Sequence, residues 1–164
     1  MAKKECEPCI FFAFRRVDRL MGQIYDPFLA KVGLKATQFT LLRALDTLGE
    51  ATLPMLSEAL TIDRTTLTRN LQLMEKRGWV AIRAGLDRRT RFITLTAGGE
   101  TKLAEALPYW QQAQDGIYEL YGRENWLALR ENLNQMVAQI AALPATMQER
   151  MQRPDDAARP DENP

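Results

Sequence analysis

The side chains best suited to bind a charged partner are gathered in one segment, from Thr61 to Leu95. This window holds eight basic and three acidic residues, a formal charge of +5, although the whole chain of 164 residues carries only +1. The other residues together carry −4, so a basic middle is enclosed in an acidic frame. Clustered Lys and Arg side chains attract phosphate groups. The segment therefore indicates a nucleic-acid partner that the near-neutral total conceals.

Polar and apolar residues are distributed in this window as on the two sides of an α-helix. Asp63 suits the N-cap position, and Leu67, Leu71 and Met74 fall on one side of the helix that follows. The other side presents Arg64, Thr65, Thr66, Thr68 and Arg69. Arginine binds guanine through two hydrogen bonds, and threonine offers a hydroxyl to phosphate and a methyl to thymine. A solvated polar face is the alternative, but the charged hairpin expected next favours contact with DNA.

Catalytic machinery is not evident in the sequence. The chain has no histidine, which excludes Ser/His/Asp and Cys/His relays, Cys/His zinc fingers and an imidazole pH switch. Carboxylate pairs occur, but no glycine-rich phosphate loop, metal-ligand set or paired nucleophile and base accompanies them. We therefore expect neither an enzyme nor a bound cofactor or metal.

The two cysteines, Cys6 and Cys9, stand close together near the N-terminus. Such a pair could form a reversible disulfide, because the start of a helix activates a thiol. Two other interpretations stay open: an incidental pair at a frayed end, or half of a four-sulfur metal site completed across a dimer. The cysteines are not spread as in secreted domains, and we find no export signal or membrane-spanning run. We expect a cytoplasmic protein.

Helices and one hairpin must position these residues. Apolar residues recur every three or four positions in a first helix from Ile10 to Phe28, which should stop near Gly33. Caps and glycine stops indicate further helices from Thr37 to Leu48, after Thr52, from Asp63 to Arg77, after Thr96, and from about Glu124 to Leu143. Residues 79–82 and 92–95 are typical of two strands joined by a charged turn.

This order predicts a mainly α fold with a small β-hairpin wing. A compact helical trio followed by a hairpin is a winged helix-turn-helix, with the helix from Asp63 to Arg77 in the recognition position. We expect this DNA-binding domain at residues 35–96, flanked by dimerisation helices at 1–34 and 97–144. The rows of apolar residues on the flanking helices are longer than the DNA-binding domain can cover. They therefore require a partner, most simply a second copy of this chain. Residues 145–164, rich in proline and acidic residues, should form a flexible tail.

The sequence resembles the MarR family of bacterial transcriptional regulators from about Ile10 to Leu143. The resemblance is carried by runs in the family's order and spacing: Ala36-Thr37-Gln38-Phe39-Thr40-Leu41-Leu42, Leu56 to Leu71, Leu73 to Val80, Asp87-Arg88-Arg89, and Leu95 to Gly99. It implies an obligate homodimer with interlocked terminal helices and two winged lobes that read a pseudo-palindromic operator. It also implies a small-molecule cleft between the dimer and DNA-binding regions.

The resemblance further assigns roles in the wing. It implies that Arg89 enters the minor groove and that Asp87 holds its guanidinium, an arrangement favoured by the negative potential of a narrow groove. Arg88 and Arg91 are expected at phosphates, and Thr37 in the second helix is counted with the DNA-binding residues. The alternative for the wing is an exposed salt bridge of little energetic value.

An effector site is expected near the start of the first helix. The run from Phe11 to Arg16 places aromatic residues beside two cations, which suits an aromatic acid whose carboxylate pairs with Arg16 next to Phe12. The alternative is an aromatic dimer core with the arginines paired at the surface. We therefore expect a homodimeric repressor, released from operator DNA by a small aromatic or phenolic acid. The competing functions are a repressor that senses oxidation through Cys6 and Cys9, and a winged-helix protein-interaction module.

Overall fold

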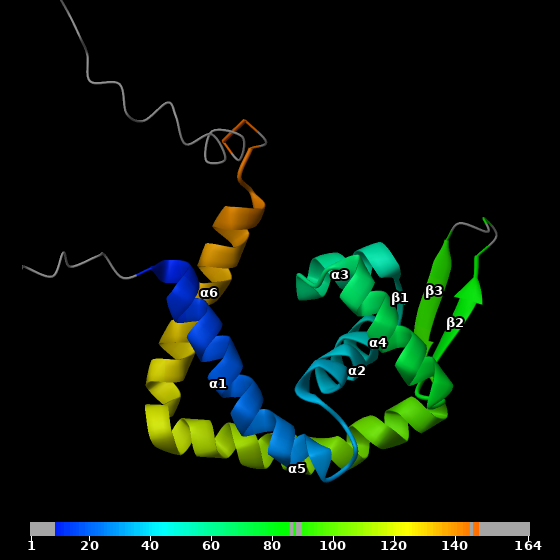
Figure 1. Cartoon of the computed structure of the whole chain (residues 1–164), viewed down its shortest axis with the longest axis horizontal. Helices are drawn as coiled ribbons and strands as arrows, with labels where there is room; N and C mark the ends of the chain where they lie inside the picture. Colours follow the sequence, from blue (N-terminus) through cyan, green and yellow to red (C-terminus); the bar gives the residue numbers. More distant parts are fainter. Residues whose placement is uncertain (1–8, 86, 88–89, 145, 148–164) are drawn as a thin grey trace, which may run out of the picture. The chain divides into compact units, whose positions relative to one another are not determined.

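The computed structural model describes residues 9–85, 87, 90–144 and 146–147. Its elements are α1 (Ile10–Ala30), α2 (Ala36–Leu48), β1 (Glu50–Thr52), α3 (Leu53–Leu60), α4 (Arg64–Lys76), β2 (Val80–Ala84), β3 (Arg91–Leu95), α5 (Ala97–Tyr121) and α6 (Arg123–Ala141) (Figure 1). The chain divides into two compact units, the first ending at Gly116 and the second beginning at Ile117, within α5. Of the tail expected over residues 145–164, only residues 146 and 147 are described.

The prediction of a mainly α fold with a small hairpin is confirmed. Strands β2 and β3 pair antiparallel, from Val80 opposite Leu95 to Ala84 opposite Arg91. The sequence pattern does not predict β1, which pairs with the other edge of β3. Three residues are too few to show the alternation by which a strand is recognised. The extra strand makes β3 the central strand of the sheet and ties the hairpin to the turn between α2 and α3.

The core of the first unit consists mainly of leucine side chains. Its fully or almost fully buried members include Leu29 of α1, Leu41, Leu42 and Leu45 of α2, Leu56 of α3, Leu67, Leu71 and Met74 of α4, Ile93 of β3, and Leu103 and Ala106 of α5. Every residue of α1 from Ile10 to Leu20 is, by contrast, exposed. Only the C-terminal part of α1 is therefore anchored in this core.

Three predicted helix starts are confirmed by hydrogen bonds to the side chain of the N-cap residue. The capping oxygens are Thr52 Oγ1, Asp63 Oδ1 and Thr96 Oγ1, and they accept the N–H groups of Met55 at 3.5 Å, Thr66 at 2.9 Å and Gly99 at 3.0 Å. Each bond satisfies a backbone donor that has no partner within its own helix.

The expectation that Thr37 caps the second helix is wrong. Helix α2 begins at Ala36, with Lys35 as its N-cap residue, so Thr37 lies inside the first turn. The N–H of Ala36 donates to Asp26 Oδ1 at 2.8 Å, and the N–H of Lys35 donates to Gln38 Oε1 at 3.0 Å. The capping carboxylate comes from α1, and a local sequence pattern does not reveal such a partner.

Helices α1, α3 and α4 end in a turn with one left-handed residue: Gly33 (φ 71°), Thr61 (φ 51°) and Gly78 (φ 72°). After α4, the N–H of Trp79 donates to the carbonyl of Met74 at 2.9 Å, and the N–H of Gly78 donates to that of Glu75 at 2.9 Å. This pattern satisfies carbonyls that the end of a helix leaves unpaired. Threonine is an unfavourable residue in this conformation because its Cβ is branched.

Replacing Thr61 with glycine is expected to raise the free energy of unfolding by about 0.5–1 kcal/mol, because glycine adopts the left-handed conformation without steric cost. The matched variant is Gly78→Ala, where no atom lies within 4 Å of the added Cβ. Its backbone strain should lower the free energy of unfolding by about 1 kcal/mol. Urea unfolding measures both changes, and a Thr61→Gly protein less stable than the wild type would show that Thr61 is not strained.

Candidate nucleic-acid interface

Helix α4 is buried on one side and exposed on the other. Leu67 and Met74 are fully buried and Leu71 is 2% exposed. These side chains are four and three positions apart, so their burial fixes the rotation of the helix about its own axis. The opposite side is therefore exposed to solvent.

The outward side of α4 carries a shallow depression of about 430 Å³, lined by Arg64, Thr65, Thr68, Arg69 and Gln72. The guanidinium groups of Arg64 and Arg69 form no hydrogen bond or ion pair with any residue that the structure describes. Thr68 donates its hydroxyl proton to the carbonyl of Arg64 at 2.6 Å, so its oxygen remains available as an acceptor. Two unpaired guanidinium groups suit guanine edges or phosphates.

Thr66 and Gln72 lie differently from the expectation. Thr66 is exposed, but it does not line the depression; its N–H is bonded to Asp63 and its carbonyl accepts from Asn70 Nδ2 at 3.0 Å. Gln72 lines the depression, although it lies beyond the first two turns of the helix, where the sequence pattern predicts the DNA contacts. Its position four residues after Thr68 already places it on the same side. A glutamine amide can bind adenine through two hydrogen bonds, so Gln72 is chemically suited to a base contact of a second kind.

Asp63 fixes the start of α4. Hydrogen bonds from the side chain and backbone of Thr66 hold the pKa of the Asp63 carboxyl below its usual value. The carboxyl is therefore ionised at neutral pH, where its charge also suits the positive end of the helix dipole. Its contribution to stability is present above the ordinary carboxyl pKa and is lost as the pH falls through the lowered value.

The turn between β2 and β3 carries the wing candidates. It is closed by hydrogen bonds from the N–H of Gly85 to the carbonyl of Thr90 at 2.8 Å and from the N–H of Thr90 to the carbonyl of Asp87 at 2.9 Å. Asp87 is exposed. Arg88 and Arg89 lie outside the described residues, so their assigned roles stay predictions.

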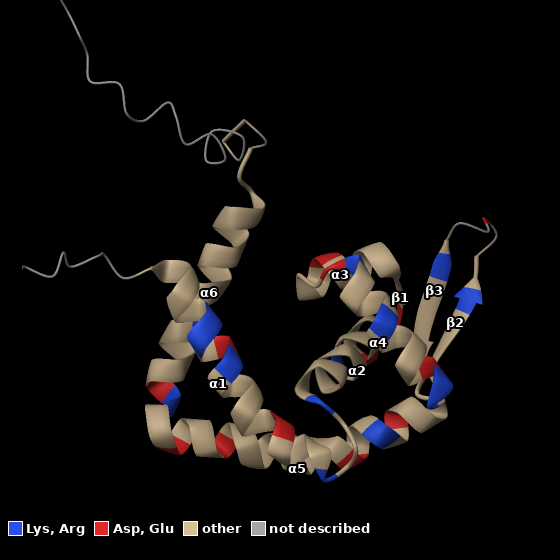
Figure 2. Cartoon of the chain, in the orientation of Figure 1, with Lys and Arg blue, Asp and Glu red and all other residues tan. Residues whose placement is uncertain are grey.

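Two arginines on the strands differ in what they bind. Arg83 of β2 pairs with Glu50 of β1, and its guanidinium lies 5.4 Å from the centre of the Phe92 ring. Arg91 is exposed at the start of β3, and its side chain pairs with no carboxylate in the described part of the chain. Figure 2 shows basic residues on α4 and on both strands of the hairpin. Arg91 is therefore available to a phosphate, whereas Arg83 is held within the sheet.

The structure does not bring Thr37 to the depression on α4. Thr37 instead lines a cavity of about 560 Å³ between α1 and the start of α2, together with Asp18, Arg19, Met21, Gly22, Tyr25, Asp26, Lys35, Ala36 and Thr40. The expected effector residues, Phe12 and Arg16, do not line this cavity. They are exposed on α1 six and two residues before Asp18, the first residue that lines the cavity, and the Arg16 guanidinium lies 5.7 Å from the Phe12 ring centre.

The structure describes only one of the two cysteines that could take part in a disulfide or a metal site. Cys9 is exposed at the N-cap position of α1, and Cys6 lies outside the described residues. Within the described ranges, no three Cys, Asp or Glu side chains are grouped so that they could hold a metal ion. None of the helices described combines the length and apolar character needed to cross a bilayer.

Comparison with known proteins connects this geometry to transcriptional regulators. Residues 32–90 match the model of a family described as the MarR family. YwoH of Bacillus subtilis strain 168, described as an uncharacterized HTH-type transcriptional regulator, is 32% identical over 87 residues, which cover 53% of this chain and 64% of YwoH. The match thus spans less than two thirds of the length of that relative.

Solved structures extend the similarity to most of the chain. The Mycobacterium tuberculosis transcriptional regulator MosR, in complex with DNA, is 34% identical, with a TM-score of 0.73 over 83% of this chain and 100% of MosR. Bordetella bronchiseptica BpsR, whose DNA binding is regulated by 6-hydroxynicotinic acid, has a TM-score of 0.73 over 84% of this chain and 99% of BpsR. Its 22% identity shows a shared fold alone. YwoH and MosR are both described as transcriptional regulators and not as enzymes. This agrees with the prediction, made from the sequence, that this chain is not an enzyme.

Proposed function

The chain belongs to the MarR family of transcriptional regulators, and we propose that it acts as a homodimeric repressor that binds a pseudo-palindromic DNA operator. The observation that carries this proposal is the outward side of α4, where the guanidinium groups of Arg64 and Arg69 stand unpaired beside one depression. MosR, which shares the fold, has been observed in complex with DNA. Because such a regulator acts on genomic DNA, we propose a cytoplasmic location.

We propose that α4 enters the major groove. Arg64 and Arg69 bind guanine edges or phosphates, Gln72 binds adenine, and Thr65, Thr66, Thr68 and Thr37 contribute further polar or methyl contacts. In the wing, Arg89 enters the minor groove with Asp87 orienting it, while Arg88 and Arg91 neutralise phosphates. The exposure and lack of a carboxylate partner at Arg91 support the last assignment.

The proposed domains follow the distribution of burial. Residues 35–96 form the DNA-binding domain, and the helices within 1–34 and 97–144 form the dimerisation surface. The support is a set of large apolar side chains that stay exposed on these helices, among them Phe11 at 74%, Leu20 at 51%, Leu120 at 82% and Ile140 at 53%. A second copy of the chain would remove this apolar surface from water. A dimer would present two α4 helices, which must lie about 34–36 Å apart to reach successive major grooves.

The proposed effector is a small aromatic acid that binds beside α1. The cavity between α1 and α2 offers the cations Arg19 and Lys35 together with the apolar surfaces of Met21 and Tyr25. Such a combination suits a carboxylate attached to a ring. Arg16, whose guanidinium lies 5.7 Å from the Phe12 ring centre, is another cation available on α1. BpsR, which shares the fold, responds to an acid of this class. Binding of the acid would release DNA only if the acid has a higher affinity for a dimer conformation that cannot bind DNA than for the conformation that can.

Oxidation is the competing signal. The Cys9 thiol is exposed at the start of α1, which makes it accessible to peroxide. A disulfide with Cys6 would constrain the segment that precedes the proposed dimerisation helix.

Arginine variants test the DNA-binding proposal. Duplexes bound by the full chain are first selected from random DNA. Arg69→Ala is expected to weaken binding to the selected duplex roughly tenfold, because a bidentate arginine–guanine pair is lost. Arg89→Ala should weaken binding. It should also lower the salt slope, the steepness with which the logarithm of the affinity falls with the logarithm of the salt concentration, by about one unit. The control is Arg43→Ala, since Arg43 is exposed on α2 and already pairs with Asp46 at 3.6 Å.

Fluorescence anisotropy across a salt titration measures these effects. Equal weakening by all three substitutions would argue against a specific role for α4 and the wing. A wild-type chain that binds no duplex even at low salt would favour the protein-interaction module instead.

The dimer proposal is tested by placing a charge on the exposed apolar surface. Phe11→Glu and Leu120→Glu should shift the chain from dimer to monomer in sedimentation experiments, because a carboxylate would be buried without a partner. Both side chains are mostly exposed in one chain, so neither change removes packing from its core. Leu48→Glu, at a leucine 42% exposed on α2, is the control and should stay dimeric. A wild-type chain that sediments as a monomer would refute the proposal.

The effector proposal is tested with variants of two arginines and one cysteine at or near α1. Salicylate and 6-hydroxynicotinate are added to the complex of the wild type with its selected duplex. Arg19→Ala should abolish release of DNA while basal DNA affinity stays unchanged, and Arg16→Ala should do the same if the acid lies against Phe12 instead. Cys9→Ser is the matched control for peroxide treatment. Release by peroxide alone, lost in Cys9→Ser, would support the redox repressor and contradict the aromatic-acid proposal.

A further inference from the structure

Trp79 lies where the recognition helix ends. It directly follows the left-handed residue Gly78, and its N–H is bonded to the carbonyl of Met74 in the last turn of α4. The side chain is only 9% exposed and belongs to the core of the first unit. The position of this ring is therefore rigidly linked to the end of α4.

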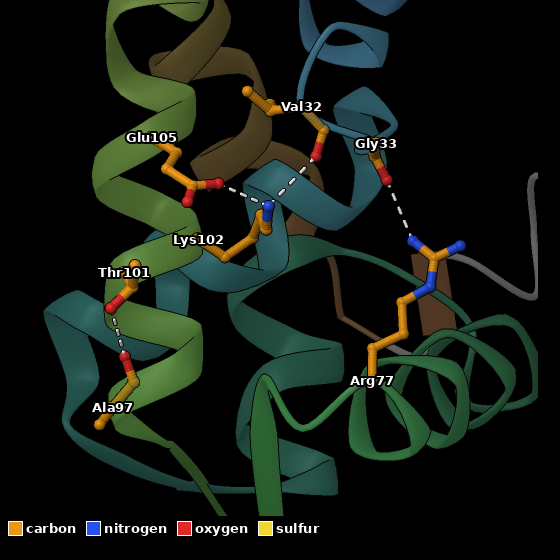
Figure 3. A network of polar contacts seen from close by, with 7 residues as sticks. All are labelled: Val32, Gly33, Arg77, Ala97, Thr101, Lys102 and Glu105. Atoms are coloured by element: carbon orange, nitrogen blue, oxygen red, sulfur yellow. Dashed lines mark hydrogen bonds and ion pairs between the residues drawn. The ribbon is translucent and has the colours of Figure 1, made fainter.

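Two cations, Arg77 and Lys102, bind backbone carbonyls just after the end of α1 (Figure 3). Arg77, the C-cap residue of α4, donates from Nη1 to the carbonyl of Gly33 at 3.0 Å. Lys102 of α5 donates from Nζ to the carbonyl of Val32 at 3.4 Å and to Glu105 at 2.5 Å. Both carbonyls follow the last turn of α1, where backbone oxygens lack helical partners and attract positive charge.

The same two cations face the Trp79 ring. The Arg77 Cζ atom lies 4.9 Å and the Lys102 Nζ atom 5.9 Å from the ring centre. Both distances fall within the range of a cation–π interaction, and burial of the ring strengthens such a contact. Arg77 and Lys102 therefore each touch both the end of α1 and the residue that follows α4.

The start of α5 is fixed to the same backbone. Thr96 donates from its N–H to the carbonyl of Trp79 at 3.1 Å and from Oγ1 to the carbonyl of Gly78 at 2.5 Å. A Cβ atom at Gly99 would lie 2.0 Å from the carbonyl oxygen of Trp79, so only glycine allows this approach. The ends of α1 and α4 and the beginning of α5 thus meet at one joint, which we define as Val32, Gly33, Arg77, Trp79 and Lys102.

We propose that Arg77 and Lys102 are positioning residues, which fix the orientation of α4 relative to α1 and α5 through this joint. The proposal rests on the proposed function, in which α1 and α5 contribute to the dimer and α4 binds DNA. Arg77 differs from Arg64 and Arg69 because its guanidinium is already engaged by a carbonyl and a ring. The joint then determines the distance between the two recognition helices of a dimer, and thereby which spacing of half-sites is bound.

The test compares operators of different spacing. The full chain is titrated with its selected duplex and with duplexes that carry one or two extra base pairs between the half-sites. Lys102→Met and Arg77→Met keep most of the side-chain length and remove the charge. Each is expected to weaken binding to the selected spacing by about three- to tenfold, because a cation–π contact and a charged hydrogen bond are lost. The preference among spacings should shrink, while the salt slope stays that of the wild type.

Two further variants separate positioning from other roles. Lys102→Arg keeps a cation and should restore the spacing preference. Lys76→Met removes a neighbouring charge from the exposed last turn of α4 and should leave the preference unchanged. If Arg77→Met fails to fold by circular dichroism, Arg77→Lys replaces it and should retain part of the preference.

Four results would overturn the proposal. An unchanged spacing preference in folded Lys102→Met and Arg77→Met proteins would show that the joint does not orient α4. A salt slope lowered by about one unit would show instead that these cations bind phosphate directly. A lower melting temperature with wild-type affinity would limit them to a role in stability. A wild-type chain without DNA affinity would refute the proposed function itself, and the joint with it.

Discussion

Burial of the apolar side of α4 is the constraint on which the rest of the structure depends. Leu67, Leu71 and Met74 belong to a core shared with α1, α2, α3, β3 and α5. Truncating one such side chain typically costs about 2–5 kcal/mol, a large part of the roughly 5–15 kcal/mol that stabilises a domain. The helix is therefore not free to rotate, and its polar residues face outward as a consequence of packing. The candidate interface is rigid because the core beneath it is.

The formal charge of the segment from Thr61 to Leu95 overstates the interface. Arg77 is engaged by the carbonyl of Gly33, and Arg83 by Glu50 of the neighbouring strand. Both hold elements of the fold together, whereas Arg64, Arg69 and Arg91 have side chains without a partner in the described part of the chain. The formal charge identifies a candidate segment, but only the contacts separate cations that hold the fold together from those available to a nucleic acid.

Sequence reasoning succeeded where the cause of a structure is local. The caps at Thr52, Asp63 and Thr96 and the stop at Gly78 depend on residues within one turn, and all four are found. β1 depends on pairing with a strand about forty residues later, and α2 is capped by Asp26 rather than by Thr37. At the interface, periodicity identified four of the five residues that line the depression, and extending it by one turn adds Gln72. The wing residues Arg88 and Arg89 remain predictions that rest on the family resemblance.

The short connection between α1 and α2 would link the proposed effector cavity to the proposed DNA-binding helix. Its first part, at Val32 and Gly33, supplies the carbonyls that hold Lys102 and Arg77. Its last residue, Lys35, and the capped start of α2 line the cavity proposed for an aromatic acid. A connection of so few residues, fixed at both ends by hydrogen bonds, has little freedom to move at one end alone. An acid that displaced Lys35 or competed with the Asp26 cap would therefore act on the segment that we propose orients α4. Its difference in affinity for two positions of that segment would be the energy available to release the operator.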